Sequence, residues 1–274
     1  ATVSRALRGA TNVTEETRIK VQRAADQLNF TLSKSASALA SGKTMRVILL
    51  VSGKLNEWFN SGVLQGVYEE LAPVGYDVTP AFITDRSELD RFFSQLPKSR
   101  NADAIIISSF QLMPAMRDQL QAIDLPTVGV NVPTESGYFD ASVSIDNSSA
   151  MTMAVRLLRS LGHTNIAFCS DYIPADMVYN TSQRTHAFAD AAQTNATDGI
   201  TFSLLTADAH DAPLSKSDLA SQLTAKLLSL PERPTAVCVE TDQVAIALVK
   251  ELRKQHLNVP EDISVLGFDD AEIA

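Results

Sequence analysis

Residues 234–270 read PTAVCVETDQVAIALVKELRKQHLNVPEDISVLGFDD, and the period of their hydrophobic pattern changes twice. The apolar run Ala236–Val239 predicts a buried strand, Asp242–Gln255 carries apolar residues at helical spacing, and Ile263–Phe268 is a second strand-like run. A strand, a helix and a second strand in this order predict a βαβ unit, in which the crossover makes the two strands parallel. The stretch therefore predicts an α/β protein whose sheet is covered by helices on both faces.

The same alternation extends back along the chain to residue 45. Further strands are predicted at Met45–Ser52, Tyr76–Phe82, Asp103–Ser108, Thr127–Asn131, Ser142–Ile145, Ile166–Cys169 and Thr201–Leu205. Further helices are predicted at Trp58–Val74, Arg86–Leu96, Pro114–Ile123, Ser148–Leu161, Ser182–Gln193 and Lys216–Leu230. These units are too many for one sheet, so we predict two doubly wound lobes. Ligands of such folds bind at the carboxyl ends of the strands, which here means the cleft between the lobes.

Residues 1–46 differ in charge from the rest of the chain. They hold eight Lys or Arg and three Asp or Glu, a net charge of +5, whereas the remainder holds 15 basic and 29 acidic residues, a net charge of −14. A small basic segment on a large acidic body predicts that the segment meets a polyanion and that the body has another role.

Three short helical stretches are predicted within this basic segment. Residues 1–7 form the first, and Thr14 caps a second helix that has two glutamates in its first turn. The third, Ser35–Ala40, is rich in Ala and Ser and precedes the first strand of the body. The segment therefore reads as a small all-α head.

Composition excludes several classes of protein. Although 45% of the 274 residues are hydrophobic, no apolar run approaches the roughly 20 residues that cross a bilayer, and the N-terminus lacks a signal-peptide pattern. We therefore expect a cytoplasmic protein with no membrane partner. Cys169 and Cys238 lie in strand-like runs, which favours buried reduced thiols over a disulfide. Without a Cys/His cluster or a catalytic motif, no metal, cofactor or enzymatic activity is predicted.

Motifs in a fixed order occur along essentially the whole chain. The segments that carry them are TVSRAL at 2–7, VTEETRIKV at 13–21, LNF at 28–30, VSIDN at 143–147, LGHTNIA at 161–167 and the stretch 234–270. Together they resemble the lactose-repressor (LacI/GalR) family of bacterial transcription regulators. The most specific part of this resemblance lies in the body, in VSIDN at 143–147, LGHTNIA at 161–167 and the stretch 234–270.

For the head, the resemblance implies a helix-turn-helix whose recognition helix lies in the major groove of DNA. Thr2, Ser4 and Arg5 would face the DNA, and Arg5 could read guanine or contact phosphate. Asn12 would lie at the DNA backbone. Leu39 occupies the position of the leucine that family members insert into the minor groove, where an apolar side chain kinks the duplex.

The resemblance also divides the chain. We predict a partial helix-turn-helix head at 1–31, a hinge helix and linker at 32–44, an N-terminal effector lobe at 45–146, a C-terminal effector lobe at 147–270, and the start of a return crossover at 271–274. The chain begins at the recognition helix, so we expect a head that is truncated at its N-terminus. In the hinge, Leu32-Ser33 and Ala36-Ser37 stand where the family commonly has Pro-Asn and Ala-Arg, and the missing arginine removes a positive charge near the minor groove.

For the body, the resemblance implies an effector-binding domain similar to periplasmic sugar-binding proteins. The implied effector-binding residues are Trp58, Phe59, Asn131, Arg184, Thr241 and Asp269. The aromatic rings would stack on the ligand, Arg184 would hold its hydroxyls or carboxylates, and Asp269 would accept hydrogen bonds. Asn131 replaces a frequent aspartate and Thr241 a usual asparagine. Two plainer interpretations stay open: Trp58 as a core aromatic, and Arg184 as a surface ion pair.

The combined prediction is a ligand-responsive transcriptional regulator, a repressor that binds double-stranded operator DNA as a homodimer. Its effector would be a sugar-like small molecule, with a nucleoside or purine as the less favoured class. The alternative is a sugar-binding or transport component with the same two lobes and no role on DNA. A metabolic enzyme is the third interpretation, and no catalytic constellation supports it.

Overall fold

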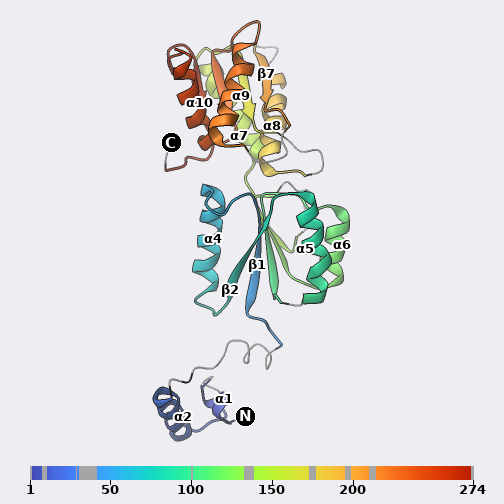
Figure 1. Cartoon of the computed structure of the whole chain (residues 1–274), viewed down its shortest axis with the longest axis vertical. Coiled ribbons are helices and arrows are strands. Elements are labelled where there is room, and N and C mark those ends of the chain that lie inside the picture. The colour runs from blue at the N-terminus through green and yellow to red at the C-terminus, as the bar shows by residue number, and fades with distance from the viewer. Residues whose placement is uncertain are drawn as a thin grey trace.

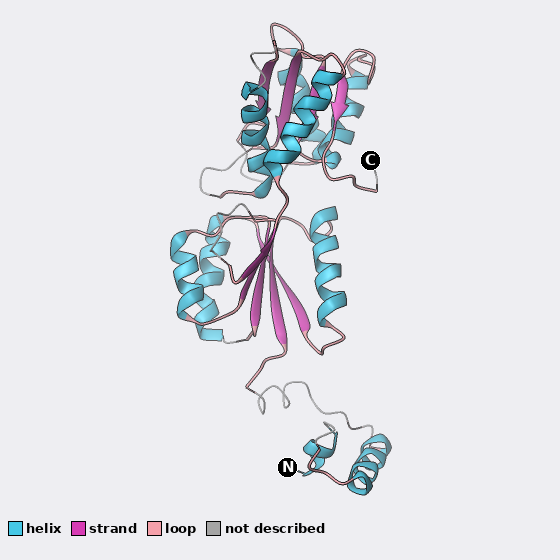
Figure 2. Ribbon diagram, turned by 180° about the vertical axis from the view of Figure 1, so that it is seen from behind, coloured by secondary structure: helices cyan, strands magenta, loops and turns pink. Residues whose placement is uncertain are grey.

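The computed structural model describes the chain in nine ranges, namely residues 2–7, 11–28, 30, 42–99, 101–132, 139–172, 177–194, 199–209 and 214–272. Figure 1 and Figure 2 show two α/β lobes, one above the other, with a pair of helices at the N-terminal end of the molecule. The predicted fold class, two doubly wound lobes with a small helical head, is confirmed.

The first lobe contains a five-stranded parallel sheet with the strand order β2-β1-β3-β4-β5. Its strands are β1 (Arg46–Ser52), β2 (Asp77–Ile83), β3 (Ala104–Ser108), β4 (Thr127–Val130) and β5 (Ala141–Val143). β1 lies between two neighbours because residues 47–51 are apolar at every position and can be buried on both faces of the sheet.

Helices lie on both faces of this sheet. Figure 1 shows α4 (Trp58–Leu71) on one side and α5 (Arg86–Ser99) with α6 (Pro114–Ala122) on the other. Phe93 of α5 and Met116 of α6 pack against the apolar side chains of β1 and β3. This layering leaves the carboxyl ends of the strands and the start of α4 at the end of the lobe that faces the second lobe.

The second lobe contains a four-stranded parallel sheet with the order β7-β6-β8-β9. Its strands are β6 (Asn165–Ser170), β7 (Thr201–Thr206), β8 (Ala236–Val239) and β9 (Ser264–Leu266). Its helices are α7 (Asn147–Ser160), α8 (Asn180–Thr194), α9 (Lys216–Leu228) and α10 (Asp242–Lys254). One core lies under α9 and α10 and another under α7 and α8.

The two cysteines belong to different cores of the second lobe. Cys169 packs in the core under α9 and α10, and Cys238 packs in the core under α7 and α8. Both are free buried thiols, as predicted, because they project from opposite faces of one sheet.

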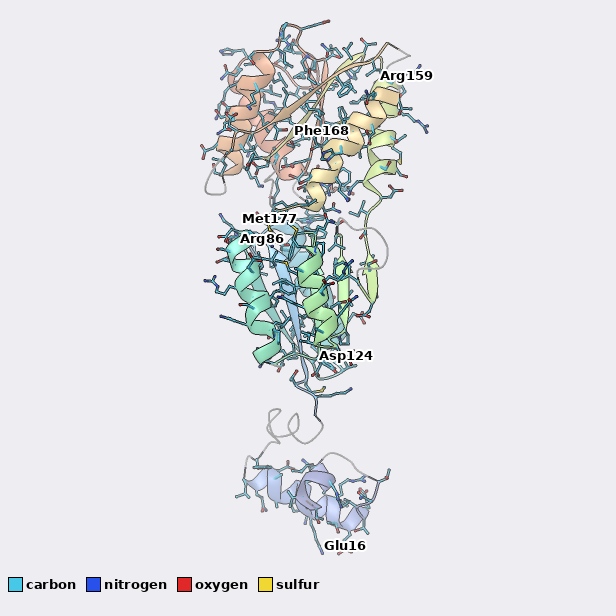
Figure 3. The ribbon with its side chains drawn as sticks, turned by 90° about the vertical axis from the view of Figure 1, so that its right-hand side faces the viewer. Glu16, Arg86, Asp124, Arg159, Phe168 and Met177 are labelled. Atoms are coloured by element: carbon cyan, nitrogen blue, oxygen red, sulfur yellow. The ribbon has the colours of Figure 1, made fainter. Side chains whose placement is uncertain are left out.

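The chain connects the lobes at more than one place. Residues 144–146 run from β5 into α7, and an antiparallel bridge joins Phe110 of the first lobe to Tyr179 just before α8. Beside this bridge the Gln111 N–H donates to the Val178 carbonyl at 2.8 Å. Met177 is buried in the first core, and Figure 3 places it at the end of the first lobe that faces the second. The range predicted for the second lobe, 147–270, therefore includes a segment that packs on the first.

Some elements end before the sequence pattern predicts. α4 stops at Leu71, because the Tyr76 N–H donates to the Leu71 carbonyl at 3.1 Å and Gly75 takes a left-handed φ of 89°. β9 stops at Leu266, although the apolar run continues to Phe268. The Phe268 carbonyl accepts the Asp242 N–H at 2.8 Å, so this part of the chain bonds to the start of α10 and not to β8.

The described part of the head consists of two helices. They are α1 (Thr2–Leu7) and α2 (Glu15–Gln27), and Thr14 caps α2 by accepting the Thr17 N–H at 3.4 Å. Ala6 and Ala25 are buried in this pair. The third stretch that the sequence predicts, Ser35–Ala40, lies outside the described residues, and so does Leu39.

Candidate functional site

A pocket of 310 Å³ lies where the carboxyl ends of the strands of both lobes meet. It is lined by Trp58, Phe59, Ile145, Phe268, Asp269 and Asp270. The first two residues begin α4 in the first lobe, Ile145 belongs to the connection into α7, and the last three follow β9 in the second lobe. Three aromatic rings and two carboxylates therefore come together from three separate parts of the sequence.

Asn60 positions the aromatic wall of the pocket. Its side chain is buried, and Nδ2 donates to the carbonyl oxygens of Ser52 at 2.7 Å and Lys54 at 3.1 Å. These bonds tie the loop after β1 to the first turn of α4. Trp58 keeps 41% of its surface exposed, and its ring centroid lies 6.2 Å from that of Phe59. The interpretation of Trp58 as a core aromatic is wrong, because the side chain is exposed and lines the pocket.

Arg184 lies behind the pocket and is 3% exposed. Its Nη1 is 3.2 Å from Asp269 Oδ1 and also donates to the Glu240 backbone carbonyl, while Nε donates to Asn147 Oδ1 at 3.4 Å. Its guanidinium carbon lies 3.6 Å from the centroid of the Phe268 ring. The interpretation of Arg184 as a surface ion pair is wrong, because every one of these contacts is made inside the second lobe.

Asp269 is held in an unusual backbone conformation, with φ of 111°. Burial raises the pKa of its carboxyl to about 6, although the Arg184 guanidinium acts in the opposite direction, and the nearby Asp242 carboxylate raises it further. Asp242 in turn accepts the Ala271 N–H at 2.8 Å. Gly267 permits this arrangement, since a Cβ atom there would stand 2.0 Å from Asp242 Oδ1.

Glu240 is a buried acid of the site that the sequence reasoning missed. It directly follows β8, is 6% exposed, and its Oε1 accepts the Asp171 N–H at 3.0 Å. Burial raises the pKa of this carboxyl to about 7. The only signal in the sequence is an acidic residue immediately after an apolar strand, at the sheet end where ligands bind.

Asn131 and Thr241 do not line the pocket, although both lie at the ends of strands that point toward it. Asn131 follows β4 with φ of 50° and is buried, and its Oδ1 has no hydrogen-bond partner among the described residues. Thr241 precedes α10 without capping it, and its buried Oγ1 likewise lacks a partner within the described ranges. The predicted effector set is therefore divided: Trp58, Phe59 and Asp269 line one pocket, and Arg184 supports it from behind.

Two family models match the chain. That of bacterial regulatory proteins of the lacI family matches residues 1–33, and that of the periplasmic binding protein-like domain matches residues 155–274. The chain is 29% identical to the HTH-type transcriptional repressor PurR of Vibrio cholerae over 276 residues, which cover the whole chain and 78% of that protein. It is 26% identical to catabolite control protein A of Priestia megaterium, with the whole chain and 80% of that protein covered. The chain belongs to the LacI/GalR family.

Solved structures of the family share this fold. The lac repressor dimer bound to operator and the anti-inducer ONPF superimposes with a TM-score of 0.79 at 21% identity, covering 99% of this chain and 78% of that one. The complex of the transcriptional regulator CelR with cellobiose gives a TM-score of 0.66 at 25% identity, covering the whole chain and 80% of that one. The relatives by sequence are transcriptional regulators, so the chain is a regulator and not an enzyme.

In this LacI/GalR member the residues predicted to meet DNA lie on or beside α1. Thr2 and Arg5 are exposed on α1, Ser4 belongs to the same helix, and Asn12 is exposed in the turn between α1 and α2. Arg5 has no ion-pair partner among the described residues, whereas Lys20 on α2 bonds Glu16 at 2.7 Å. A basic side chain without an acidic partner is available to a phosphate or a base edge.

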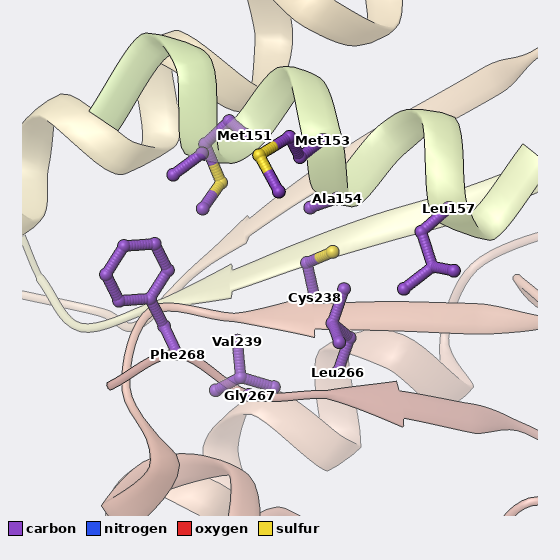
Figure 4. A pocket seen from close by; sticks show the side chains of 10 residues that line it. Met151, Met153, Ala154, Leu157, Cys238, Val239, Leu266, Gly267 and Phe268 are labelled. Atoms are coloured by element: carbon purple, nitrogen blue, oxygen red, sulfur yellow. The ribbon is translucent and has the colours of Figure 1, made fainter. Parts of the chain in front are cut away.

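A second pocket of this LacI/GalR member, of 370 Å³, lies between α7 and the sheet of the second lobe. Figure 4 shows Met151, Met153, Ala154 and Leu157 of α7 facing Cys238 and Leu266. No charged side chain of the described residues lines it, so it lacks the groups that orient a hydroxylated ligand. No described group of three or more His, Cys, Asp or Glu side chains could hold a metal ion, and no described helix is long and apolar enough to cross a membrane.

Proposed function

We propose that this regulator is a repressor whose affinity for operator DNA is set by a sugar-like small molecule bound between the lobes. The pocket of Trp58, Phe59 and Asp269 carries this proposal, because one ligand in it would touch both lobes at once. A ligand can shift a conformational equilibrium only through contacts that differ between the two states. Contacts to both lobes provide such a difference.

The lining of the pocket supports a hydroxylated ring as the effector. Aromatic rings stack on the apolar faces of sugar rings, and a carboxylate accepts hydrogen bonds from hydroxyls. Asp269 supplies the carboxylate, held in place by Arg184 at 3.2 Å. The CelR structure contains cellobiose, and a LacI regulator from Lactobacillus casei, 26% identical to this chain, contains glucose. A nucleoside or purine is the second class, favoured by the likeness to PurR.

The connections between the lobes would transmit the effector signal. Residues 144–146 and the bridge between Phe110 and Tyr179 are the places where the lobes would turn relative to each other. Through the predicted hinge at 32–44 this movement would change how the head presents Thr2 and Arg5 to the operator. Half-sites are read in pairs, so the repressor would act as a homodimer. As a repressor of operator DNA it would work in the cytoplasm.

Operator binding in the presence of candidate effectors tests this proposal. A thermal-shift screen of sugars, nucleosides and purines would identify a ligand, and fluorescence anisotropy with labelled DNA would then measure operator affinity with and without it. We expect affinity to fall steeply with salt concentration, because phosphate contacts release counterions. A ligand that binds the wild-type chain but changes operator affinity by less than about twofold would contradict effector control.

Trp58→Ala is the variant that ties this effect to the pocket. Trp58 is 41% exposed, so its removal should leave the fold intact and weaken both the thermal shift and the change in operator affinity. Tyr68→Ala is the matched control, because Tyr68 is 59% exposed later on the same helix and does not line the pocket. Equal effector responses in the two variants would exclude the pocket as the effector site.

A further inference from the structure

We propose that this pocket selects an effector that carries a positive charge, a hydroxylated ring with a protonated amine, and excludes phosphorylated and carboxylated ligands. This inference rests on the proposed function, since it concerns the charge of the molecule that the same pocket binds. It follows from the charged groups that line the pocket, those behind it and the nature of its walls.

Acidic groups dominate the lining. Asp269 and Asp270 both line the pocket, and no Lys, Arg or His of the described residues does so. Asp270 is exposed and has no ion-pair partner within the described ranges. An anionic ligand would therefore approach two carboxylates without a basic side chain to receive it, whereas an ammonium group would find an acceptor in each.

Arg184 is the cation that lies behind the pocket in the described part of the chain, and its guanidinium is already paired within the protein. Arg184 contacts the Asp269 carboxylate, the Glu240 carbonyl and the Asn147 amide oxygen, and its plane covers the Phe268 ring. Two further buried acids, Glu240 and Asp242, lie close enough to act on its charge. Even where Glu240 holds its proton, one guanidinium cannot balance the two carboxylates of Asp242 and Asp269, so the surroundings of the pocket keep an excess of negative charge.

Three of the helix starts that open toward the other lobe, those of α4, α7 and α10, add to this negative charge, whereas the first turn of α8 carries no acidic residue. The N-terminus of a helix attracts anions through its unpaired N–H groups and its dipole. At α7 this position holds Asp146, whose Oδ1 accepts the Ser149 N–H at 2.9 Å, and at α10 it holds Asp242 in the first turn. Glu57 stands at the N-cap of α4. Each of these three helix starts therefore presents a carboxylate where an anionic ligand would have to bind.

The aromatic walls suit the same ligand. Trp58, Phe59 and Phe268 supply rings whose faces attract a cation and also stack on a sugar ring. Phe268 already accepts the Arg184 guanidinium at 3.6 Å, which shows that its ring is used in this way. A volume of 310 Å³ is at the lower end of the range for small-molecule sites, so a single ring fits the pocket.

Quenching of tryptophan fluorescence tests the charge of the pocket without knowledge of the ligand. Trp58 is the only tryptophan of the chain, so its emission reports on the pocket alone. In the full chain at low ionic strength we expect caesium to quench Trp58 about two- to threefold more efficiently than iodide, each relative to free N-acetyltryptophanamide. Iodide quenching equal to or stronger than caesium quenching, on that scale, would overturn the proposal.

Two variants assign the effect to a residue. Asp270→Asn removes one exposed negative charge from the lining and should bring the caesium-to-iodide ratio closer to one. Glu261→Gln removes an exposed charge ahead of β9, at the other end of that strand from the pocket, and should leave the ratio unchanged. An equal effect of both substitutions would assign the preference to the overall negative charge of the chain and overturn the proposal.

Binding of matched ligands then tests the chemical class. Glucosamine, glucose and glucose 6-phosphate share a ring and differ in charge, and at about pH 6.5 we expect affinity to decrease in that order, with Asp270→Asn reducing the preference for the amine. Tighter binding of the phosphate than of the amine would overturn the proposal and leave effector control by a sugar intact. Caesium-selective quenching without binding of any of the three would contradict the sugar class in the proposed function, while the charge selectivity of the pocket would stand.

Discussion

The two lobes contribute to the pocket in opposite ways. The first lobe presents Trp58 and Phe59 on the opening turn of α4, partly exposed and held by neutral hydrogen bonds from Asn60 to the backbone. The second lobe presents Asp269, which is held by a buried ion pair with Arg184. Aromatic rings can stack on a ligand only if they stay exposed to it. A carboxylate, in contrast, is held in one position by burial and by its ion pair. The four predictions below test this difference between the lobes.

Arg184→Ala should have the largest effect. Removing the guanidinium leaves Asp269 and the Glu240 carbonyl without their buried partner, and such a loss typically costs about 3–5 kcal/mol of unfolding free energy. Urea unfolding followed by circular dichroism would measure it. Arg86→Ala is the control in the first lobe, because the Arg86–Asp90 pair is partly exposed to solvent on a single helix and should contribute less than about 1 kcal/mol. Equal costs would contradict the comparison.

Glu240→Gln should change how stability depends on pH. The folded-state pKa of Glu240 is raised to about 7 from an ordinary value of 4.5, so the folded state holds the proton more tightly than the unfolded state. Stability should therefore fall as pH rises from about 4.5 to about 7, by about 3 kcal/mol for this group. Asp269 acts in the same direction, from 3.8 to about 6.

The glutamine variant removes the titration and can still accept the Asp171 N–H. Between pH 6 and pH 7.5 its unfolding free energy should vary less than that of the wild type, because residue 240 no longer titrates. Both proteins share the titration of Asp269, and most of its effect on stability falls below pH 6. Urea unfolding at intervals across pH 5–8.5 would show the difference. Parallel curves for both proteins would mean that Glu240 does not retain its proton in the folded state.

Asn60→Ala should destabilise the first lobe by about 1–3 kcal/mol. It removes the buried amide that donates to the carbonyls of Ser52 and Lys54. It should also weaken effector binding, because the first turn of α4 carries Trp58. Ser61→Ala is the matched control in the same turn. Ser61 is exposed and its hydroxyl donates to the Trp58 carbonyl at 2.9 Å, so the loss of this hydroxyl should cost less than about 0.5 kcal/mol. Comparable unfolding curves for the two variants would show that Asn60 does not anchor the turn.

Trp58→Ala should have the smallest effect on stability. With 41% of its surface exposed and no place in a buried core, the side chain should contribute less than a fully buried aromatic ring. Affinity for an identified effector should nevertheless fall by about tenfold or more, and Trp58→Phe should recover part of it, since a ring is kept. Isothermal titration calorimetry would measure both variants. A large loss of stability without a loss of affinity would show that Trp58 stabilises the fold, as Asn60 does, and does not bind the effector.

Local patterns predicted most of the fold because burial dictates them. The apolar run of β1 and the helical spacing of α10 each follow from one element alone, and both elements occur where the pattern places them. The end of β9 could not be predicted in this way. Phe268 is as apolar as the residues before it, and only the bond from the Asp242 N–H to its carbonyl takes it out of the sheet.

The site shows the same division. The sequence proposes Trp58 and Asp269 through the resemblance to the LacI/GalR family, and each follows a strand at the sheet end where ligands bind. Glu240 follows β8 at the same end, but its protonation depends on burial by residues far away in the chain. The position of Met177 in the core of the first lobe also has no local signal, since it depends on the bridge between Phe110 and Tyr179.

By itself the sequence determined the alternation of strands and helices, the separation of a basic head from an acidic body, and the resemblance to a family of regulators. These properties depend on residue type and spacing along the chain, which are local. Only the tertiary structure decided that Arg184 is buried against Asp269, Glu240, Asn147 and the Phe268 ring, that Phe268 joins the aromatic wall, and that the pocket is acidic. Such properties depend on distances between residues far apart in sequence, because charge and burial act through space.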